Sequence, residues 1–175
     1  MSDARIYGES LYELAKDEKI SEEILSELKK LNTLFKEHPD YVKILDSPQI
    51  PRRELMSILN EDFFGRANGY MLNFIKLLSE KHMVHCLDEC LKEFERQYNR
   101  DNNIRVVHVT TAKPMSETLA ARLVKKLEKK TGGKIILKHK IDHSCIGGII
   151  IKTDNMSIDA SVINELNTLR KTIAN

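Results

Sequence analysis

Histidines and cysteines that could hold a metal ion are concentrated between residues 82 and 90. They are His82, His85, Cys86 and Cys90. Side chains three and four residues apart share one face of a helix, and zinc takes nitrogen and sulfur ligands of these two types. However, Cys90 flanks an apolar stripe, cysteine is among the most often buried residue types, and structural zinc sites usually draw on two segments. We therefore expect these residues to pack in the fold, with no bound metal and no cofactor.

A second cluster, Asp142, His143 and Cys145, has the residue types of a nucleophile with its base. Neighbours in a strand or turn seldom point at one another, and catalytic triads are assembled from distant segments. The adjacent Gly147 and Gly148 lack the spacing of a phosphate-binding loop, and they precede a predicted strand instead of a helix. The sequence thus offers no convincing active site, and we expect the protein not to be an enzyme.

Lysines are dense between residues 125 and 140. They are Lys125, Lys126, Lys129, Lys130, Lys134, Lys138 and Lys140. Phosphate binding needs such charges on one surface, but residues 101–175 contain no Phe, Tyr or Trp that could stack on bases. The lysines of 125–130 lie opposite an apolar stripe, as on a solvated helix face. We therefore expect an acidic protein partner and no nucleic acid.

The overall charge hides an imbalance along the chain. Residues 1–100 hold 15 Lys and Arg against 19 Asp and Glu, whereas residues 101–175 hold 13 against 7. Such an asymmetry favours two units with different partners. No apolar run approaches the roughly 20 residues that span a bilayer, the start resembles no signal peptide, and three cysteines favour a reducing compartment. We expect a cytosolic protein without direct membrane insertion.

The spacing of apolar residues predicts a helical first domain. Up to about residue 100 they recur at helical intervals, as between Ile24 and Phe35. Prolines interrupt the pattern and mark the ends of short helices. The predicted helices are residues 4–16, 21–37, 39–46, 51–60, 67–81 and 83–100. We interpret residues 1–102 as a six-helix bundle with short loops.

After residue 102 the pattern changes to that of strands. Residues 104–111 are rich in β-branched side chains, and further strands are predicted at 135–141, 148–152 and 157–159. A helix over 116–130 places Leu119, Leu123 and Leu127 inward and ends at Gly132, and a last helix follows residue 161. The predicted fold class is α plus α/β, with the six-helix bundle followed by a small mixed domain of strands and two helices, residues 103–175.

Two predicted helices carry more apolar surface than one packed face requires. Residues 70–78, YMLNFIKLL, are apolar almost all round, and such a helix needs burial on more than one side. The first helix offers Tyr7, Leu11 and Leu14 on one stripe. Either both helices lie at the centre of the bundle, or part of this surface awaits a partner.

The stretch 141–161, IDHSCIGGIIIKTDNMSIDAS, closely resembles the C-terminal signature of the ATP synthase delta subunit family, called oligomycin-sensitivity-conferring protein in mitochondria. The matching positions are Ile141, Asp142, Ser144, Gly148, Ile149, Ile151, Lys152, Ile158, Asp159 and Ser161. Residues 7–15, YGESLYELA, resemble the opening of the family, and the order of helical and mixed parts matches along essentially the whole chain. Gly8, His143 and Ala160 depart from the residues usual in the family.

This resemblance implies a non-catalytic connector in the stator of an F-type ATP synthase, linking the peripheral stalk to the catalytic head during proton-driven ATP synthesis. It implies that residues 1–102 bind the N-terminal segments of the alpha subunits and that residues 103–175 bind the b subunits. The chain would be a monomeric subunit of a hetero-oligomeric complex, peripheral on the cytoplasmic face of the cell membrane. Such a stator resists the torque of the rotor, so it needs affinity and stiffness.

The resemblance also implies site residues. The groove for the alpha segment lies between the helices 4–16 and 67–81, where the expected contact residues are Tyr7, Leu11, Leu14, Phe74 and Leu78. The stalk-binding or family-signature residues of the second domain are Asp142, Gly147, Gly148, Ile149 and Asp159, with Lys125 and Lys129 on the basic helix.

Two other functions stay open on the residues alone. An unrelated two-domain protein-binding adaptor would show the same charge asymmetry but would not co-purify with ATP synthase subunits. A small metal or thiol enzyme would use the histidines and cysteines, and zinc analysis or thiol alkylation would reveal it.

Overall fold

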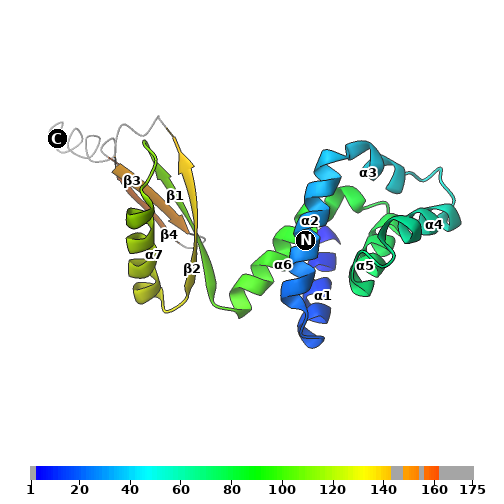
Figure 1. Cartoon of the computed structure of the whole chain (residues 1–175), viewed down its shortest axis with the longest axis horizontal. Helices are drawn as coiled ribbons and strands as arrows, with labels where there is room; N and C mark the ends of the chain where they lie inside the picture. Colours follow the sequence, from blue (N-terminus) through cyan, green and yellow to red (C-terminus); the bar gives the residue numbers. More distant parts are fainter. Residues whose placement is uncertain (1–2, 143–147, 154–155, 162–175) are drawn as a thin grey trace. The chain divides into compact units, whose positions relative to one another are not determined.

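The computed structural model describes residues 3–142, 148–153 and 156–161, and the chain divides into two compact units, Met1–Tyr98 and Asn99–Asn175 (Figure 1). The first unit is helical and the second combines strands with a helix, so the predicted combination of α and β structure is confirmed. The last predicted helix, after residue 161, lies outside the described residues.

The first unit is built from α-helices joined by short connections. They are α1 (Asp3–Asp17), α2 (Ser21–Glu37), α3 (Pro39–Leu45), α4 (Arg52–Phe63), α5 (Gly69–Glu80) and α6 (Leu87–Asp101). The prediction of a single helix over 83–100 is wrong, because a separate 3-10 turn, η1 (Val84–Cys86), precedes α6. The carboxylate of Asp46 accepts hydrogen bonds from the backbone N–H groups of Val84 (2.7 Å) and His85 (3.0 Å), and these bonds stabilise the separate turn.

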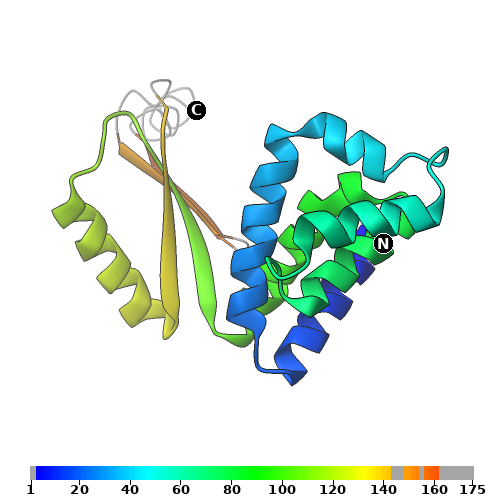
Figure 2. The same ribbon diagram turned by 45° about the vertical axis from the view of Figure 1, so that its right-hand side comes forward.

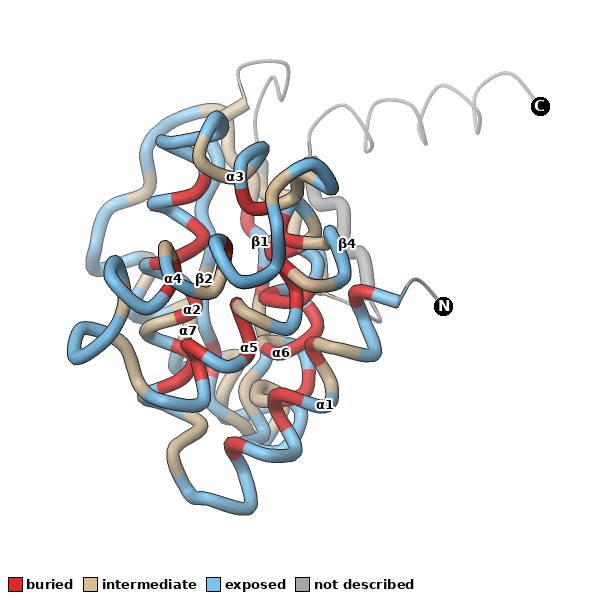
Figure 3. Tube along the Cα trace, turned by 90° about the vertical axis from the view of Figure 1, so that its right-hand side faces the viewer, coloured by how far each residue is buried: buried red, intermediate tan, exposed pale blue. Residues whose placement is uncertain are grey.

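The buried residues of the first unit lie along the inward faces of its helices (Figure 3). Helices α1 and α6 approach each other closely within this core. Tyr12 and Phe94 meet edge to face with ring centroids 5.3 Å apart, an arrangement that aromatic pairs prefer. A Cβ atom on Gly8 would lie 2.5 Å from the carbonyl oxygen of Cys90. The backbones therefore pack directly together at Gly8.

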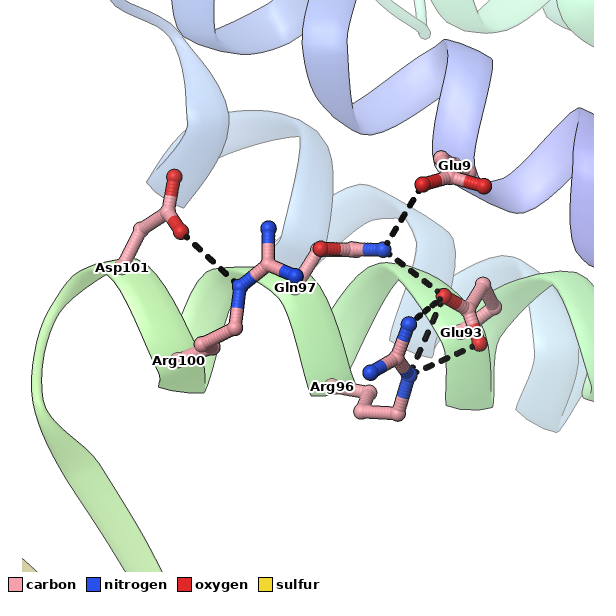
Figure 4. A network of polar contacts seen from close by, with 6 residues as sticks. All are labelled: Glu9, Glu93, Arg96, Gln97, Arg100 and Asp101. Carbon is pink, nitrogen blue, oxygen red and sulfur yellow. Dashed lines mark hydrogen bonds and ion pairs between the residues drawn. The ribbon is translucent and has the colours of Figure 1, made fainter.

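A polar network also joins α1 to α6 (Figure 4). The buried side-chain amide of Gln97 donates to Glu9 Oε1 at 3.1 Å and to Glu93 Oε1 at 2.9 Å. The Arg96 guanidinium lies 2.6 Å from Glu93, and its hydrogen bonds lower the pKa of that carboxyl. Because a buried polar group costs free energy unless it is hydrogen-bonded, this network stabilises one register of the two helices.

The second unit contains one described helix and a four-stranded mixed sheet. Its elements are β1 (Ile104–Thr111), α7 (Glu117–Thr131), β2 (Lys134–Ile141), β3 (Gly148–Thr153) and β4 (Met156–Ser161), and the strand order is β2-β1-β3-β4. β1 and β2 are parallel and connected through α7, whereas β3 pairs antiparallel with both β1 and β4. Gly132 takes the left-handed conformation (φ 68°) and ends α7, as the sequence predicts.

Helix α7 lies on one face of the sheet (Figures 1 and 2). The buried apolar residues of this unit, within its described part, are Val107, Val109 and Ile135. Leu123 and Leu127 pack against them, but Leu119, which we predicted to point inward, is 55% exposed. Met115, which precedes the helix, packs against this small core, and the first turn of α7 does not.

Candidate functional site

The apolar residues of α1 divide between the core and the surface. Leu11 is only 4% exposed and lies in the core, and Tyr7 is half-buried against that core. Leu14 and Ile6 point outward, with 43% and 51% of their surface exposed. Of the contact residues predicted on this helix, Tyr7 and Leu14 therefore keep surface that a partner can reach, whereas Leu11 does not.

Helix α5 is mostly internal. Met71, Leu72, Phe74, Ile75, Leu78 and Ser79 are buried. Of the two interpretations of this apolar segment, the central position in the bundle accounts for most of its surface, including Phe74 and Leu78. Tyr70 and Leu77, seven residues apart on the helix, remain 37% and 39% exposed. A partner contacting α5 therefore meets these two residues, which the sequence stripe did not single out.

The start of α5 lies close to the end of α1 and to the start of α2. The Glu18 carboxylate, just beyond α1, lies near the Tyr70 hydroxyl, and its charge raises the pKa of Tyr70. The backbone N–H of Asn68 donates to the Glu27 carboxylate at 3.0 Å, and its side-chain amide donates to Glu23 at 3.1 Å. Carboxylates of α2 thus hold the N-cap of α5, and the exposed residues of α1 and α5 belong to two helices that meet at one end.

The signature residues of the second unit lie in or next to three strands. Asp142 follows β2, and its backbone N–H donates to Thr111 at 2.9 Å. Ile149 packs against the small core and pairs with Thr111 of β1. Gly148 and Asp159 lie on the paired strands β3 and β4, whereas Gly147 lies outside the described residues.

Lys125 and Lys129 are exposed one turn apart on α7, next to the exposed Lys126 and Lys130. They lie on the side of α7 away from Leu127 and the sheet. This solvated basic face matches the sequence-based prediction.

The cluster between residues 82 and 90 is arranged for packing and capping. His82 adopts a left-handed conformation (φ 53°) just after α5, and His85 Nδ1 lies 2.7 Å from Asp46 Oδ2. Cys90 is buried, and burial raises the pKa of its thiol to about 12. Burial also raises the pKa of Cys86. Both thiols are thus protonated at neutral pH, which disfavours nucleophilic chemistry.

Within the part of the chain that the structure describes, three or more His, Cys, Asp and Glu side chains nowhere come together in a group that could hold a metal ion. Cys145 and His143 lie outside that part. None of the helices in the described ranges is both long and apolar enough to cross a membrane.

Comparisons with known proteins are consistent along the whole chain. The family model for the ATP synthase delta (OSCP) subunit matches residues 4–173. ATP synthase subunit delta of Clostridium botulinum (strain Loch Maree) is 32% identical over 167 residues, covering 95% of this chain and 93% of the relative. The protein of the same name from Cytophaga hutchinsonii is 29% identical over 164 residues, covering 94% and 90%.

A solved structure shares the fold. One chain of the Toxoplasma gondii mitochondrial ATP synthase hexamer superposes with a TM-score of 0.75 at 16% identity, covering 100% of this chain and 99% of that one.

Proposed function

This chain belongs to the ATP synthase delta (OSCP) subunit family, and from this premise we propose that it joins the alpha subunits of the catalytic head to the b subunits of the peripheral stalk. As a member of this family it is a non-catalytic subunit of the stator of an F-type ATP synthase. The proposal assigns one partner to each unit. Residues 1–102, as a bundle of six helices, bind the head, and residues 103–175 bind the stalk.

The exposed apolar side chains of α1 and α5 support the contact with the head. Leu14 on α1 and Tyr70 and Leu77 on α5 are each between 37% and 43% exposed, on two helices that meet at one end. An amphipathic helix from the N-terminal segment of an alpha subunit would bury these side chains by laying its apolar face against them. Tyr7 adds a half-buried ring, and interface energy concentrates in such aromatic anchors.

The charge of the second unit supports the contact with the stalk. Residues 101–175 hold 13 Lys and Arg against 7 Asp and Glu, and Lys125 and Lys129 present exposed charge on α7. Such a surface favours an acidic partner and speeds its association. The signature residues of β3 and β4, Ile149 and Asp159 among them, support the sheet beside this helix.

The contacts between α1 and α6 suit a part that carries a mechanical load. The close approach at Gly8 and the network around Gln97 hold these two helices in one arrangement. Stiffness of this kind lets a connector transmit force during proton-driven ATP synthesis without an active site. In the complex the chain would sit as a single copy, peripheral on the cytoplasmic face of the cell membrane.

The contact with the head can be tested on the full chain with a peptide that copies the N-terminal segment of the alpha subunit. Leu14→Asn should weaken binding by about tenfold or more, because a truncated anchor typically costs 1–2 kcal/mol. Ile44→Asn is the matched control, because Ile44 on α3 is 44% exposed, nearly the same as Leu14. Isothermal titration calorimetry measures both affinities. Equal losses in the two variants, or no loss with Leu14→Asn, would contradict the proposed surface.

A further inference from the structure

The sheet of the second unit has two unlike faces. Successive residues of a strand point to opposite sides, and α7 covers the side that carries Val107, Val109 and Ile135. The other side, called the open face below, carries no described helix of this unit (Figures 1 and 2). By register it carries Ile104, Val106, His108 and Thr110 of β1, Lys134, Ile136, Lys138 and Lys140 of β2, Gly148, Ile150 and Lys152 of β3, and Ser157, Asp159 and Ser161 of β4.

Strand register places basic side chains in a line across the open face. His108 of β1 is directly opposite Lys138 of β2 and directly opposite Lys152 of β3. All three side chains are exposed, as is Lys140 in the next row. Lysines gathered on one face of a sheet repel one another. Carboxylates of a partner that lie along this row would relieve the repulsion.

Apolar side chains flank this row. Ile136 is 39% exposed, and Val106 and Ile150 are half-buried. Among its described residues, Asp159 of β4, opposite Ile150, is the acidic one, against Lys134, Lys138, Lys140 and Lys152, and none is aromatic. Aliphatic surface beside a line of charge fits an amphipathic protein segment, whereas a single-stranded nucleic acid would need aromatic platforms for its bases. Strands lie about 4.8 Å apart and a helix is about 10–12 Å across, so three strands accommodate one helix.

We propose that the open face binds an acidic amphipathic helix of the peripheral stalk, with carboxylates along Lys138, His108 and Lys152 and apolar side chains on Ile136 and Ile150. This rests on the proposed function and names the surface that serves it. The chain's own residues 162–175 are a poor match in charge for this basic row, because they contain one acidic residue, Glu165, and two basic residues, Arg170 and Lys171.

Charge reversal on the full chain tests the row. The probe is the purified soluble part of the b subunit, with affinity measured by fluorescence anisotropy. Lys138→Glu with Lys152→Glu should weaken binding by at least about tenfold, because like charges placed across an interface are costly. The comparator is Lys125→Glu with Lys129→Glu, an equal change of charge on α7, which should weaken binding less because these lysines attract the partner from a distance without contacting it. If only the α7 pair of substitutions weakens binding, the open face is not the binding surface, although the chain still binds the stalk. If the unaltered chain does not bind the b probe, both the open-face proposal and the proposed stalk contact are wrong.

A matched pair of cysteine variants tests occupancy of the face. Ile136 and Ile141 lie on β2, are 39% and 43% exposed, and point to opposite faces. Ile136→Cys should react with a thiol reagent in the free chain and become protected at least about tenfold by the b probe, whereas Ile141→Cys should stay reactive. An unreactive Ile136→Cys in the folded free chain would show that the chain covers the face itself. The chain could instead bind a single-stranded oligonucleotide. If only the variant with Lys138→Glu and Lys152→Glu abolishes that binding, the open face binds nucleic acid and the proposal is wrong.

Discussion

The two units of this molecule bury very different amounts of apolar surface. In the first unit every α-helix contributes buried side chains to one core, from Ala4 on α1 to Phe94 on α6. In the described part of the second unit, Val107, Val109 and Ile135 are the buried apolar residues, and α7 buries none of its own fully. The helical unit is thus stabilised from within, and we expect the smaller unit to gain more from a bound partner.

The largest effect should come from the centre of the helical core. Phe94→Ala should lower the free energy of unfolding of the first unit by about 3–5 kcal/mol, because Phe94 is fully buried and its removal leaves a cavity. Phe64→Ala is the control, since Phe64 is 79% exposed and its loss should change stability by about 0.5 kcal/mol or less. Urea denaturation followed by circular dichroism measures both. If the two variants lost similar amounts of unfolding free energy, burial of the side chain would not determine its contribution to stability.

The next effect should appear in the second unit alone. At a concentration of the b probe about 100 times its dissociation constant, the second unit should gain about 2.7 kcal/mol of stability. Hydrogen exchange should then slow in the peptides of β1 and β2 and stay unchanged in those of α2 and α5. If hydrogen exchange slowed only in the helical unit, that unit and not the second one would gain stability from the b probe.

A smaller effect is expected at the α1–α6 crossing. Gly8→Ala should cost about 1–3 kcal/mol, because the added Cβ would lie 2.5 Å from the Cys90 carbonyl oxygen and the helices must separate. Gly69→Ala is the control, since nothing lies within 4 Å of its added Cβ, and it should change stability by about 1 kcal/mol or less. Thermal unfolding compares the two. A neutral Gly8→Ala would show that the crossing is not tight.

The smallest effect concerns Asp88, which joins α6 to Lys36 and Asn32 of α2. Hydrogen bonds from Lys36, Lys92 and Asn32 hold the pKa of Asp88 well below its usual range. A depressed pKa stabilises the fold at pH values above the unfolded pKa, about 3.9, and this contribution is lost as the pH falls toward the folded pKa. Because Asp88 is partly exposed, Asp88→Asn should cost about 1 kcal/mol or less at pH 7. Denaturation at several pH values should show the difference shrinking below pH of about 4, and a constant difference would exclude this cause.

Much of this fold is predictable from the sequence, because its periodicities are local. The strand at 104–111 and the end of α7 at Gly132 follow from β-branched residues and from a glycine free to take positive φ. The exposure of individual residues is less predictable. Leu119 is exposed, whereas Met115 packs against the small core, and Phe74 is buried because α5 lies within the bundle.

The candidate surfaces show the same limit. A helical stripe identifies Tyr7 and Leu14, but which members of the stripe stay exposed depends on neighbouring helices distant in sequence. The row of Lys138, His108 and Lys152 depends on the register of β1 against two other strands. Register is a property of the folded sheet, so no spacing within one segment reveals it.

Whether each unit binds its own partner can be decided by dividing the chain. Fragments 1–102 and 103–175 would each be titrated with the alpha N-terminal peptide and with the soluble b probe. Fragment 1–102, which has a core of its own, should bind the alpha peptide, and fragment 103–175 should bind b, each within about tenfold of the full chain. Binding of b by fragment 1–102, together with binding of the alpha peptide by fragment 103–175, would contradict this assignment of partners.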